Sequence, residues 1–302
     1  MFEHGLGWVR DLPDFRDYVP ERPWGLDEEP KAEGSRLIEA LTSLGVLTKG
    51  AVATAVALPA AADLRPWFSA IEDQGQLGSC TAHAGVGLLE YFERRSFGRW
   101  VDASRLFLYK ATRNLLQWAG DTGAYLRTTM GALTLFGACP EEYWPYVISD
   151  FDVEPPAFCY AFAQQYQALR YFRLDPPGVS GPTLVDRVRL FAAAKLPSMF
   201  GFTVYSSISA AGQKGEIPLP DPGDRVLGGH AVAIAGFDDA RQIKSPGGRA
   251  SVGAFLIRNS WGPDWGAAGY GWLPYEYVAG GLATDFWSLI KAEWIESGQF
   301  GL

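Results

Sequence analysis

The spacing of apolar residues predicts that the chain becomes regularly structured only after residue 63. From Cys80 to about Arg94 apolar residues lie almost all round the helical repeat, which predicts a buried central helix. Ser79 stands at the position of an N-cap. Gly85 and Gly87 lower helix propensity, so we expect them to permit close packing against a neighbouring element. This first half is expected to be mainly helical.

Further helices are predicted at about 102–118 and 126–136 in the first half. In the second half, segments in which apolar and polar residues alternate lie between helical segments predicted at about 158–166 and 183–194. Strands are predicted at about 169–174, 198–204, 230–237 and 253–259. Helices followed by a strand-rich region predict an α+β protein.

The first 63 residues differ from the rest. Ser35 is a candidate cap for a short amphipathic helix that ends near Gly45, and 51–58 is small and apolar. We therefore divide the chain into an N-terminal arm (1–63) and a main domain (64–302). Within the domain, about 64–168 is expected to be mainly helical and about 169–302 mainly β.

Composition and net charge limit the classes of partner and location that we expect for the protein. The 302 residues are 48% apolar and 20% charged, as in ordinary soluble globular proteins, and the net charge of -8 gives nucleic acid no electrostatic support. The longest apolar run, 51–62, contains Pro59 and is too short for the roughly 20 residues of a membrane helix. The first 17 residues show no signal peptide, so we expect a cytoplasmic protein, with export by a non-Sec route as the alternative.

The three cysteines and three histidines do not form a recognisable metal-binding spacing. We expect no metal and no cofactor. Cys139 and Cys159 are expected to be buried thiols, with a disulfide between them as the alternative.

Cys80, His230 and Asn259 are the candidate reactive groups. A thiol at a helix N-terminus has a lowered pKa and reacts as thiolate. His230 precedes an apolar strand that would hold its ring, and the Asn259 carboxamide could orient that ring. Each residue alone is more often structural: a core thiol, a core histidine, a polar turn residue.

Three segments carry a family resemblance: Gln74 to Cys80, Gly228 to Val232, and the Asn-Ser-Trp-Gly-x-x-Trp-Gly-x-x-Gly-Tyr string from Asn259 to Tyr270. Together they resemble the papain-like, cathepsin-type cysteine peptidases over about residues 63–289. The resemblance implies an α+β fold of two lobes, a helical left lobe and an antiparallel, barrel-like β right lobe, with the active-site cleft between them. It implies a Cys80 nucleophile, His230 as base and Asn259 as its orienting group. Gln74, with the Cys80 N–H, would stabilise the oxyanion.

The resemblance also implies substrate contacts. Trp261 would shield the histidine–asparagine hydrogen bond, and Trp265 would form a wall of the primed side of the cleft. The segment expected to pair with an extended substrate is Gly123, Ala124 and Tyr125. The S2 pocket would be bordered by Gly201, Phe202, Gly229 and Ala231. With no acid apparent at its base, an apolar P2 residue is expected.

Departures from the better-known relatives favour the bacterial or archaeal branch. Leu77 replaces a disulfide cysteine, Thr81 a tryptophan and His83 a phenylalanine. His83 lies one helical turn after Cys80 and is a rival base. It lacks an orienting partner, so we interpret it as a packing or polar contact.

The predicted function is a cysteine endopeptidase acting on peptides or proteins. A peptide ligase or transpeptidase with the same thiol chemistry, and a catalytically weak peptide-binding relative, are the alternatives. For the arm, two hypotheses have equal weight. Part of 1–63, with 51–61 as the segment suited to a groove, lies across the cleft as a lid or prosegment, or the arm packs against the back of the β lobe.

Overall fold

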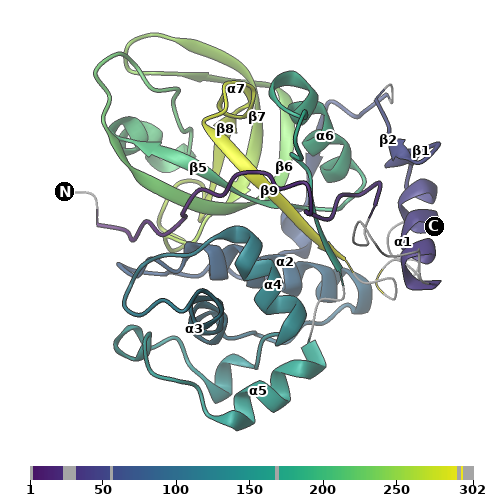
Figure 1. Ribbon diagram of the computed structural model, residues 1–302. Helices are drawn as coiled ribbons and strands as arrows, with labels where there is room; N and C mark the ends of the chain where they lie inside the picture. Colours follow the sequence, from purple (N-terminus) through teal and green to yellow (C-terminus); the bar gives the residue numbers. More distant parts are fainter. Residues whose placement is uncertain (1–2, 23–31, 55–56, 167–169, 291–293, 295–302) are drawn as a thin grey trace.

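The computed structural model describes residues 3–22, 32–54, 57–166, 170–290 and 294. It has a helical lobe and a β lobe, and the first residues of the chain run along the junction between them (Figure 1). Both lobes and the N-terminal arm therefore meet at this junction.

The helical lobe is built round α2 (Cys80–Phe97). Its other helices are α3 (Arg105–Leu116), α4 (Leu126–Leu135) and α5 (Ala157–Ala163). Short 3-10 turns lie at Arg65–Trp67, Glu141–Tyr143, Ile148–Asp150 and Gln164–Tyr166. α3 begins with a capping bond from Phe107 N–H to the Ser104 side chain, and α2 ends at a left-handed Gly98.

The β lobe is one curled antiparallel sheet in the order β4-β9-β5-β6-β7-β8, with β3 paired to β6. Its strands are β3 (Ala61–Asp63), β4 (Arg170–Arg173), β5 (Met199–Tyr205), β6 (Val226–Lys244), β7 (Ala250–Arg258), β8 (Tyr270–Pro274) and β9 (Ala283–Ile290). The helices α6 (Gly181–Ala193) and α7 (Tyr275–Ala279) and a 3-10 stretch at Ser206–Lys214 complete the lobe. Register shifts in β6 allow its length to bend with the sheet.

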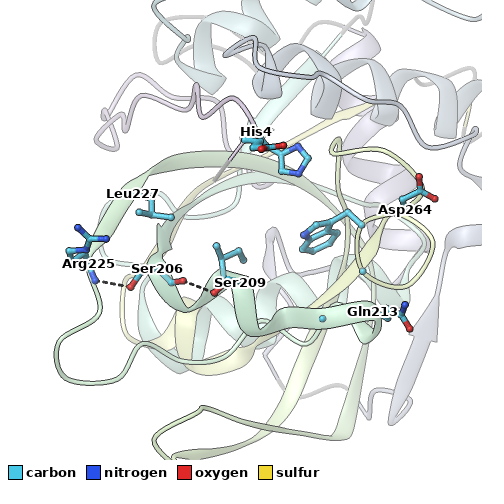
Figure 2. A pocket seen from close by; sticks show the side chains of 12 residues that line it. His4, Ser206, Ser209, Gln213, Arg225, Leu227 and Asp264 are labelled. Carbon is cyan, nitrogen blue, oxygen red and sulfur yellow. Dashed lines mark hydrogen bonds between the residues drawn. The ribbon is translucent and has the colours of Figure 1, made fainter. Parts of the chain in front are cut away.

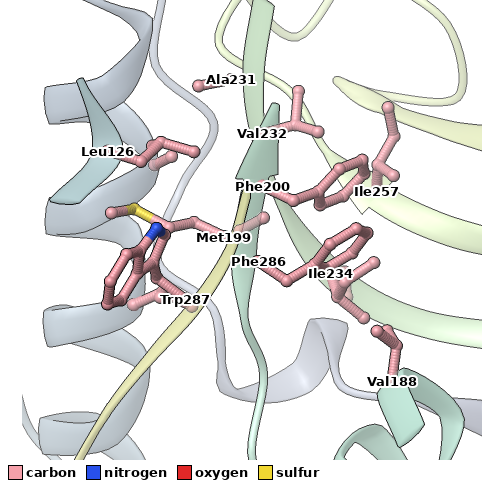
Figure 3. Packing of buried hydrophobic residues seen from close by; sticks show 14 of the residues in the cluster. Leu126, Val188, Met199, Phe200, Ala231, Val232, Ile234, Ile257, Phe286 and Trp287 are labelled. Carbon is pink, nitrogen blue, oxygen red and sulfur yellow. The ribbon is translucent and has the colours of Figure 1, made fainter. Parts of the chain in front are cut away.

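Apolar side chains cover both faces of this sheet (Figure 3). Leu126, Met199 and Trp287 face the helices, whereas Phe200 and Phe286 stack on the other face with ring centroids 4.6 Å apart. The two lobes therefore share a packed core beneath the cleft.

The second part of the arm packs outside the cleft. It forms α1 (Ala32–Ser43) and a hairpin of β1 (Leu47–Thr48) with β2 (Ala51–Val52). Leu58 and Ala53 line a small cavity with α6 residues, and β3 joins the edge of β6. The expectation that 51–61 lies in the substrate groove is wrong for its described residues; 55–56 lie outside the described residues.

Most predicted elements are present with shifted ends. The helix predicted from Ser35 begins earlier, at Ala32, so Ser35 is not its cap. Gly87 is needed for packing, because a Cβ there would lie 2.8 Å from the Arg258 guanidinium. β8 and β9 were not predicted, since both are rich in aromatic and polar residues that obscure a simple alternation.

Candidate active site

The first turn of α2 places Cys80 at the floor of the cleft. The residue is fully buried, and the helix begins at it. Ser79 does not act as the predicted N-cap: its hydroxyl bonds to the Tyr146 hydroxyl at 2.6 Å and makes no capping bond. The helix N-terminus still directs its free N–H groups toward the sulfur.

His230 and Asn259 come from neighbouring strands. His230 lies in β6, and Asn259 follows β7, which pairs with β6. The His230 Nε2 to Asn259 Oδ1 distance is 2.7 Å. Within the described residues His230 Nδ1 has no hydrogen-bond partner, and the backbone of the next residue, Ala231, bonds to the Cys80 sulfur. One ring nitrogen is therefore oriented by Asn259, and the other remains available for proton transfer.

Trp261 covers the imidazole. Its ring stacks on His230 with centroids 4.3 Å apart, and Trp265 packs edge-on against it at 5.3 Å. The indole thus lies beside the histidine–asparagine pair at the position that the sequence predicts.

Gln74 is fixed on three sides. Its Oε1 accepts from the Ser260 hydroxyl at 2.6 Å, and its Nε2 donates to Leu77 O at 2.8 Å. The same Nε2 also donates to Gly5 O of the arm at 3.0 Å. The carboxamide is therefore held as an N–H donor directed into the cleft. Sequence reasoning did not identify Ser260, although its place directly after Asn259 was visible.

Burial shifts the pKa of both reactive groups. It raises the pKa of the Cys80 thiol to about 11, against smaller lowering effects of backbone bonds from Ala231 and Gly7. It lowers the pKa of His230 to about 3, against the raising effect of Asn259. A thiol and an imidazole are both neutral between these values.

His83, the rival base, has different contacts from those of His230. It is buried in α2, where Nδ1 lies 3.1 Å from Ser79 O and the ring packs edge-on against Tyr146. Burial lowers its pKa to about 3. Among the described residues it has no carboxylate or carboxamide partner, in agreement with a packing role.

The first residues of the arm occupy the cleft. Gly5 N–H donates to Gly75 O at 3.0 Å, and Trp8 N–H donates to Gly229 O at 3.1 Å. On the facing wall Ala124 N–H donates to Gly7 O at 2.8 Å. The arm is thus hydrogen-bonded to both sides of the cleft, as an extended ligand would be.

Two arm glycines make this close approach possible. A Cβ on Gly7 would lie 1.8 Å from Gly78 O, and one on Gly5 would lie 2.2 Å from Leu77 O. The Gly5-x-Gly7 pattern was the signal in the sequence that this segment passes against another backbone.

Trp8 fills a pocket between β5 and β6. A Cβ on Gly201 would lie 1.9 Å from the indole, and one on Gly229 would lie 2.8 Å from it. The indole Nε1 donates to Asp285 Oδ2 at 3.0 Å. From the sequence, no acid was expected at the base of this pocket, and this expectation is wrong. The Asp285 carboxylate lies there because β9 runs beside β5.

The other residues predicted to contact substrate fall into two groups: some lie against the arm, and others pack against neighbouring side chains. The backbone of Ala124 pairs with the arm, and Gly123 with a positive φ forms the turn before it. Tyr125 precedes α4 and packs on Trp118. Phe202 is buried and lies edge-on to His230 at 5.8 Å. Tyr125 and Phe202 thus support the cleft from behind its surface.

Arg127 fastens the arm after the cleft. Its guanidinium bonds to Asp17 Oδ1 at 2.7 Å, to Leu12 O at 2.8 Å and to the Asp11 carboxylate. Sequence reasoning missed this contact because the residues are more than 100 positions apart.

A cavity of about 650 Å³ adjoins the end of the cleft near Trp265. Its lining includes Glu3, His4, Leu227 and Asp264, and Figure 2 shows His4 at its edge. His4 also stacks on Trp261 at 5.1 Å. The arm therefore extends past Trp261, which covers His230, to the cavity lined by Trp265.

Three general features bear on function. Among the described residues, no group of three His, Cys, Asp or Glu side chains is placed to hold a metal ion. All three cysteines, including Cys139 and Cys159, are buried free thiols. The helices within the described ranges are too short or too polar to cross a membrane.

Comparison with known proteins agrees with this geometry. Residues 58–287 match the family described as "Papain family cysteine protease". An uncharacterized peptidase C1-like protein of Acanthamoeba polyphaga mimivirus is 34% identical over 71% of this chain and 68% of its own. Cathepsin B-like CP3 of Giardia intestinalis is 26% identical over 88% of this chain and 86% of its own.

Solved structures show the same fold. Xylellain, a cysteine protease from Xylella fastidiosa, superposes with a TM-score of 0.70 at 31% identity, covering 95% of this chain and 96% of its own. Procathepsin L 3 of Tenebrio molitor larval midgut shares the fold at a TM-score of 0.60 and 18% identity, covering 80% of this chain and 72% of its own. With a matched family over most of its length, a thiol at a helix N-terminus and a histidine–asparagine pair, the chain belongs to the papain family of cysteine proteases.

Proposed function

We propose that the protein is a cysteine endopeptidase in which Cys80 is the nucleophile and His230 the general acid and base. The observation that carries this is the 2.7 Å bond from His230 Nε2 to Asn259 Oδ1, which leaves Nδ1 without a partner among the described residues, while the backbone of the adjacent Ala231 bonds to the Cys80 sulfur. A histidine oriented through one nitrogen accepts and donates a proton through the other.

In the proposed reaction His230 takes the thiol proton, and Cys80 Sγ forms a bond to the scissile carbonyl carbon. Gln74 Nε2 and the Cys80 N–H donate to the developing oxyanion. His230 then protonates the leaving amine as the C–N bond breaks. Water, deprotonated by His230, hydrolyses the thioester and restores the thiol. Acyl transfer to an amine in this last step would give the ligase alternative.

The pocket filled by Trp8 is proposed as the S2 subsite. Gly201 and Gly229 leave it open, and its walls are the apolar β5 and β6. An apolar side-chain body at P2 fits these walls.

We further propose that residues 4–9 of the arm inhibit the enzyme until they move. The contacts of Gly5 O with Gln74 and of Trp8 with Gly201 use the groups that a substrate would need. The arm passes from Trp261 to the Trp8 pocket, and its bridge to Ala124 is parallel. A substrate with its acyl part in that pocket runs the opposite way, so the arm is bound without a correctly directed scissile bond.

Labelling by an epoxide thiol-peptidase probe tests the catalytic proposal. The full-length chain with Trp8→Ala is treated with probe, alongside the same chain carrying Cys80→Ala or His230→Ala. Labelling should be lost with Cys80→Ala and strongly reduced with His230→Ala. Labelling that survives both changes would refute the assignment. Quantifying the acyl product, a free carboxylic acid or a new amide, in the presence of an added amine acceptor separates hydrolysis from transfer.

A further inference from the structure

The peptide unit between Leu77 and Gly78, in the loop that leads to Cys80, is held at both ends. Its carbonyl oxygen, Leu77 O, accepts from Gln74 Nε2 at 2.8 Å. Its N–H, on Gly78, donates to both carboxylate oxygens of Asp121, at 3.0 Å and 3.1 Å. Asp121 lies between α3 and α4. Because the C=O and N–H of a trans peptide point in opposite directions, the bond to Asp121 on one side sets the direction of the oxygen that meets Gln74 on the other.

This peptide unit orients the proposed oxyanion donor. The side-chain NH₂ of Gln74 carries two N–H donors. One donates to Leu77 O, and the other donates to Gly5 O of the arm at 3.0 Å, so the second becomes free when the arm leaves. Since the amide group is planar, the bond to Leu77 O fixes the direction of that second N–H. The carboxylate that orients the peptide unit therefore affects how well Gln74 is directed at an oxyanion.

A second series of bonds leads from Asp121 to the edge that pairs with an extended chain. Asp121 Oδ1 accepts from the Tyr109 hydroxyl at 2.6 Å, and that hydroxyl accepts from Gly123 N–H at 3.1 Å. Tyr109 is completely buried in α3, and burial together with the Asp121 bond raises its pKa, so the hydroxyl keeps its proton. The residue after Gly123 is Ala124, whose N–H donates to Gly7 O of the arm at 2.8 Å. One carboxylate thus connects the pairing edge to the nucleophile loop.

Hydrogen bonds and packing join these two segments. Leu77 takes the place of a disulfide cysteine, and all three cysteines of the chain lie within the described residues as free thiols. The segments approach closely: a Cβ on Gly78 would lie 2.9 Å from Asp121 Oδ1 and 3.5 Å from Gly123 N. The geometry of the nucleophile loop relative to the pairing edge therefore depends on the bonds of this carboxylate.

We propose that Asp121 is a positioning residue for the peptidase reaction, which couples the substrate-pairing edge at Gly123 to the Gln74 oxyanion donor through the peptide N–H of Gly78. The proposal rests on the proposed peptidase function and adds a residue that acts through others. Ser260 also holds the Gln74 carboxamide, through a bond of 2.6 Å to its Oε1. Loss of Asp121 should therefore weaken the oxyanion donor without abolishing it.

A double-mutant cycle tests the link to Gln74. We measure kcat and KM for a fluorogenic peptide in the full-length chain with Trp8→Ala, into which Asp121→Ala and Gln74→Ala are introduced singly and together. Asp121→Ala should lower kcat about tenfold when Gln74 is present, and less than about twofold when Gln74 is already alanine. An equal loss in both backgrounds, as a purely structural role would give, overturns the proposal. An unchanged kcat in the presence of Gln74 also overturns it.

Two conservative variants separate the two links. In Asp121→Asn the amide oxygen can accept from both Tyr109 and Gly78, so kcat should stay within about threefold of the parent value. Tyr109→Phe keeps the bond between Asp121 and Gly78 but takes the acceptor away from Gly123 N–H, so KM should rise about three- to tenfold with kcat nearly unchanged. If Asp121→Asn lost as much kcat as Asp121→Ala, the charge would be responsible and the positioning role would be wrong.

Asp152→Asn is the matched control in the same loop. The Asp152 carboxylate accepts from Gly120 N–H at 3.1 Å and from Arg113 Nη1 at 2.8 Å. Asparagine can keep the bond to the buried Arg113 and loses the one to Gly120, at the start of the loop. Both kcat and KM should change by less than about twofold. A loss equal to that of Asp121→Ala would mean that any loosening of the loop lowers activity, against a particular role of Asp121.

Amide hydrogen exchange, followed by NMR, gives a readout besides activity. Asp121→Ala should speed exchange at the N–H groups of both Gly78 and Gly123, whereas Tyr109→Phe should speed it at Gly123 alone. Unfolding temperatures of the same variants show which of them are folded. Unchanged exchange at Gly78 in folded Asp121→Ala contradicts the proposal.

The outcomes also separate this inference from the peptidase function. Cys80-dependent cleavage with a kcat that Asp121→Ala leaves unchanged keeps the peptidase function and removes the positioning role. Absence of cleavage by the parent chain, or cleavage that survives Cys80→Ala, refutes the peptidase function and the positioning role with it.

Discussion

The wall of the cleft and the arm that lies in it are held in different ways. Cys80, His230 and Asn259 stand on a helix start and two paired strands, so their positions follow from the core. The arm from Glu3 to Asp17 contains no helix and only an isolated bridge to Ala124 in the cleft. It is held by backbone hydrogen bonds, by the Gln74 carboxamide, by the rings of His4 and Trp8, and by Arg127 and Arg173. Such contacts can be exchanged for those of a substrate, whereas those of the wall cannot.

The largest expected effect comes from removing the histidine in the wall of the cleft. In the Trp8→Ala chain, His230→Ala should lower kcat/KM for a peptide substrate by at least about 10³-fold, because it removes the histidine that the Asn259 carboxamide orients. His83→Phe is the matched control: it removes the rival imidazole from the same helix as Cys80 and should change kcat/KM by less than about fivefold. If His83→Phe were the more damaging change, the two histidines would have to exchange roles.

The pH dependence of Cys80 reactivity should differ between the wild-type chain, in which the arm covers the cleft, and the Trp8→Ala chain. With the arm in place the pKa of Cys80 is raised to about 11 and that of His230 is lowered to about 3, both through burial. A raised thiol pKa keeps the proton on sulfur until the pH approaches that value. At pH 7 the thiolate fraction is then on the order of one in ten thousand.

Stopped-flow alkylation by iodoacetamide across pH 5–10 measures this difference. The wild-type rate should be low near neutral pH and still rising at the alkaline limit. The Trp8→Ala chain, with the cleft opened to water, should show a lower apparent pKa and a rate about 10- to 100-fold higher at pH 7. Superimposable profiles would show that the arm does not control the thiol.

A smaller effect is expected where the arm is fastened. Arg127→Gln removes the bonds to Asp11 and Asp17, so probe labelling of Cys80 should accelerate about three- to tenfold. Arg16→Gln is the control, since Arg16 bonds to Asp14 within the arm itself on an exposed surface. Equal acceleration by both changes would indicate a general charge effect and no fastening by Arg127.

The difference between wall and arm also explains what the sequence could predict. The central helix is recognisable because its apolar residues are contiguous, and the Asn259-Ser-Trp string lies in one short segment. Contacts between distant positions, such as Trp8 with Asp285 or Arg127 with Asp17, carry no local periodicity. The same holds for Asp285, which lies in a strand that the apolar pattern did not predict. One of the two hypotheses for the arm placed it in the cleft, but through residues 51–61, because small apolar residues were weighted above the glycines that allow close approach.

The most direct test of the account is the rate at which an epoxide probe labels Cys80 in the full-length chain at pH 7. Wild type is compared with Trp8→Ala, which empties the pocket, and with Trp100→Ala, which removes a more exposed tryptophan that stacks on Arg94. We expect the second-order rate constant to rise at least about tenfold for Trp8→Ala and to stay unchanged for Trp100→Ala. Equal rates for wild type and Trp8→Ala would contradict the claim that the arm closes the active site.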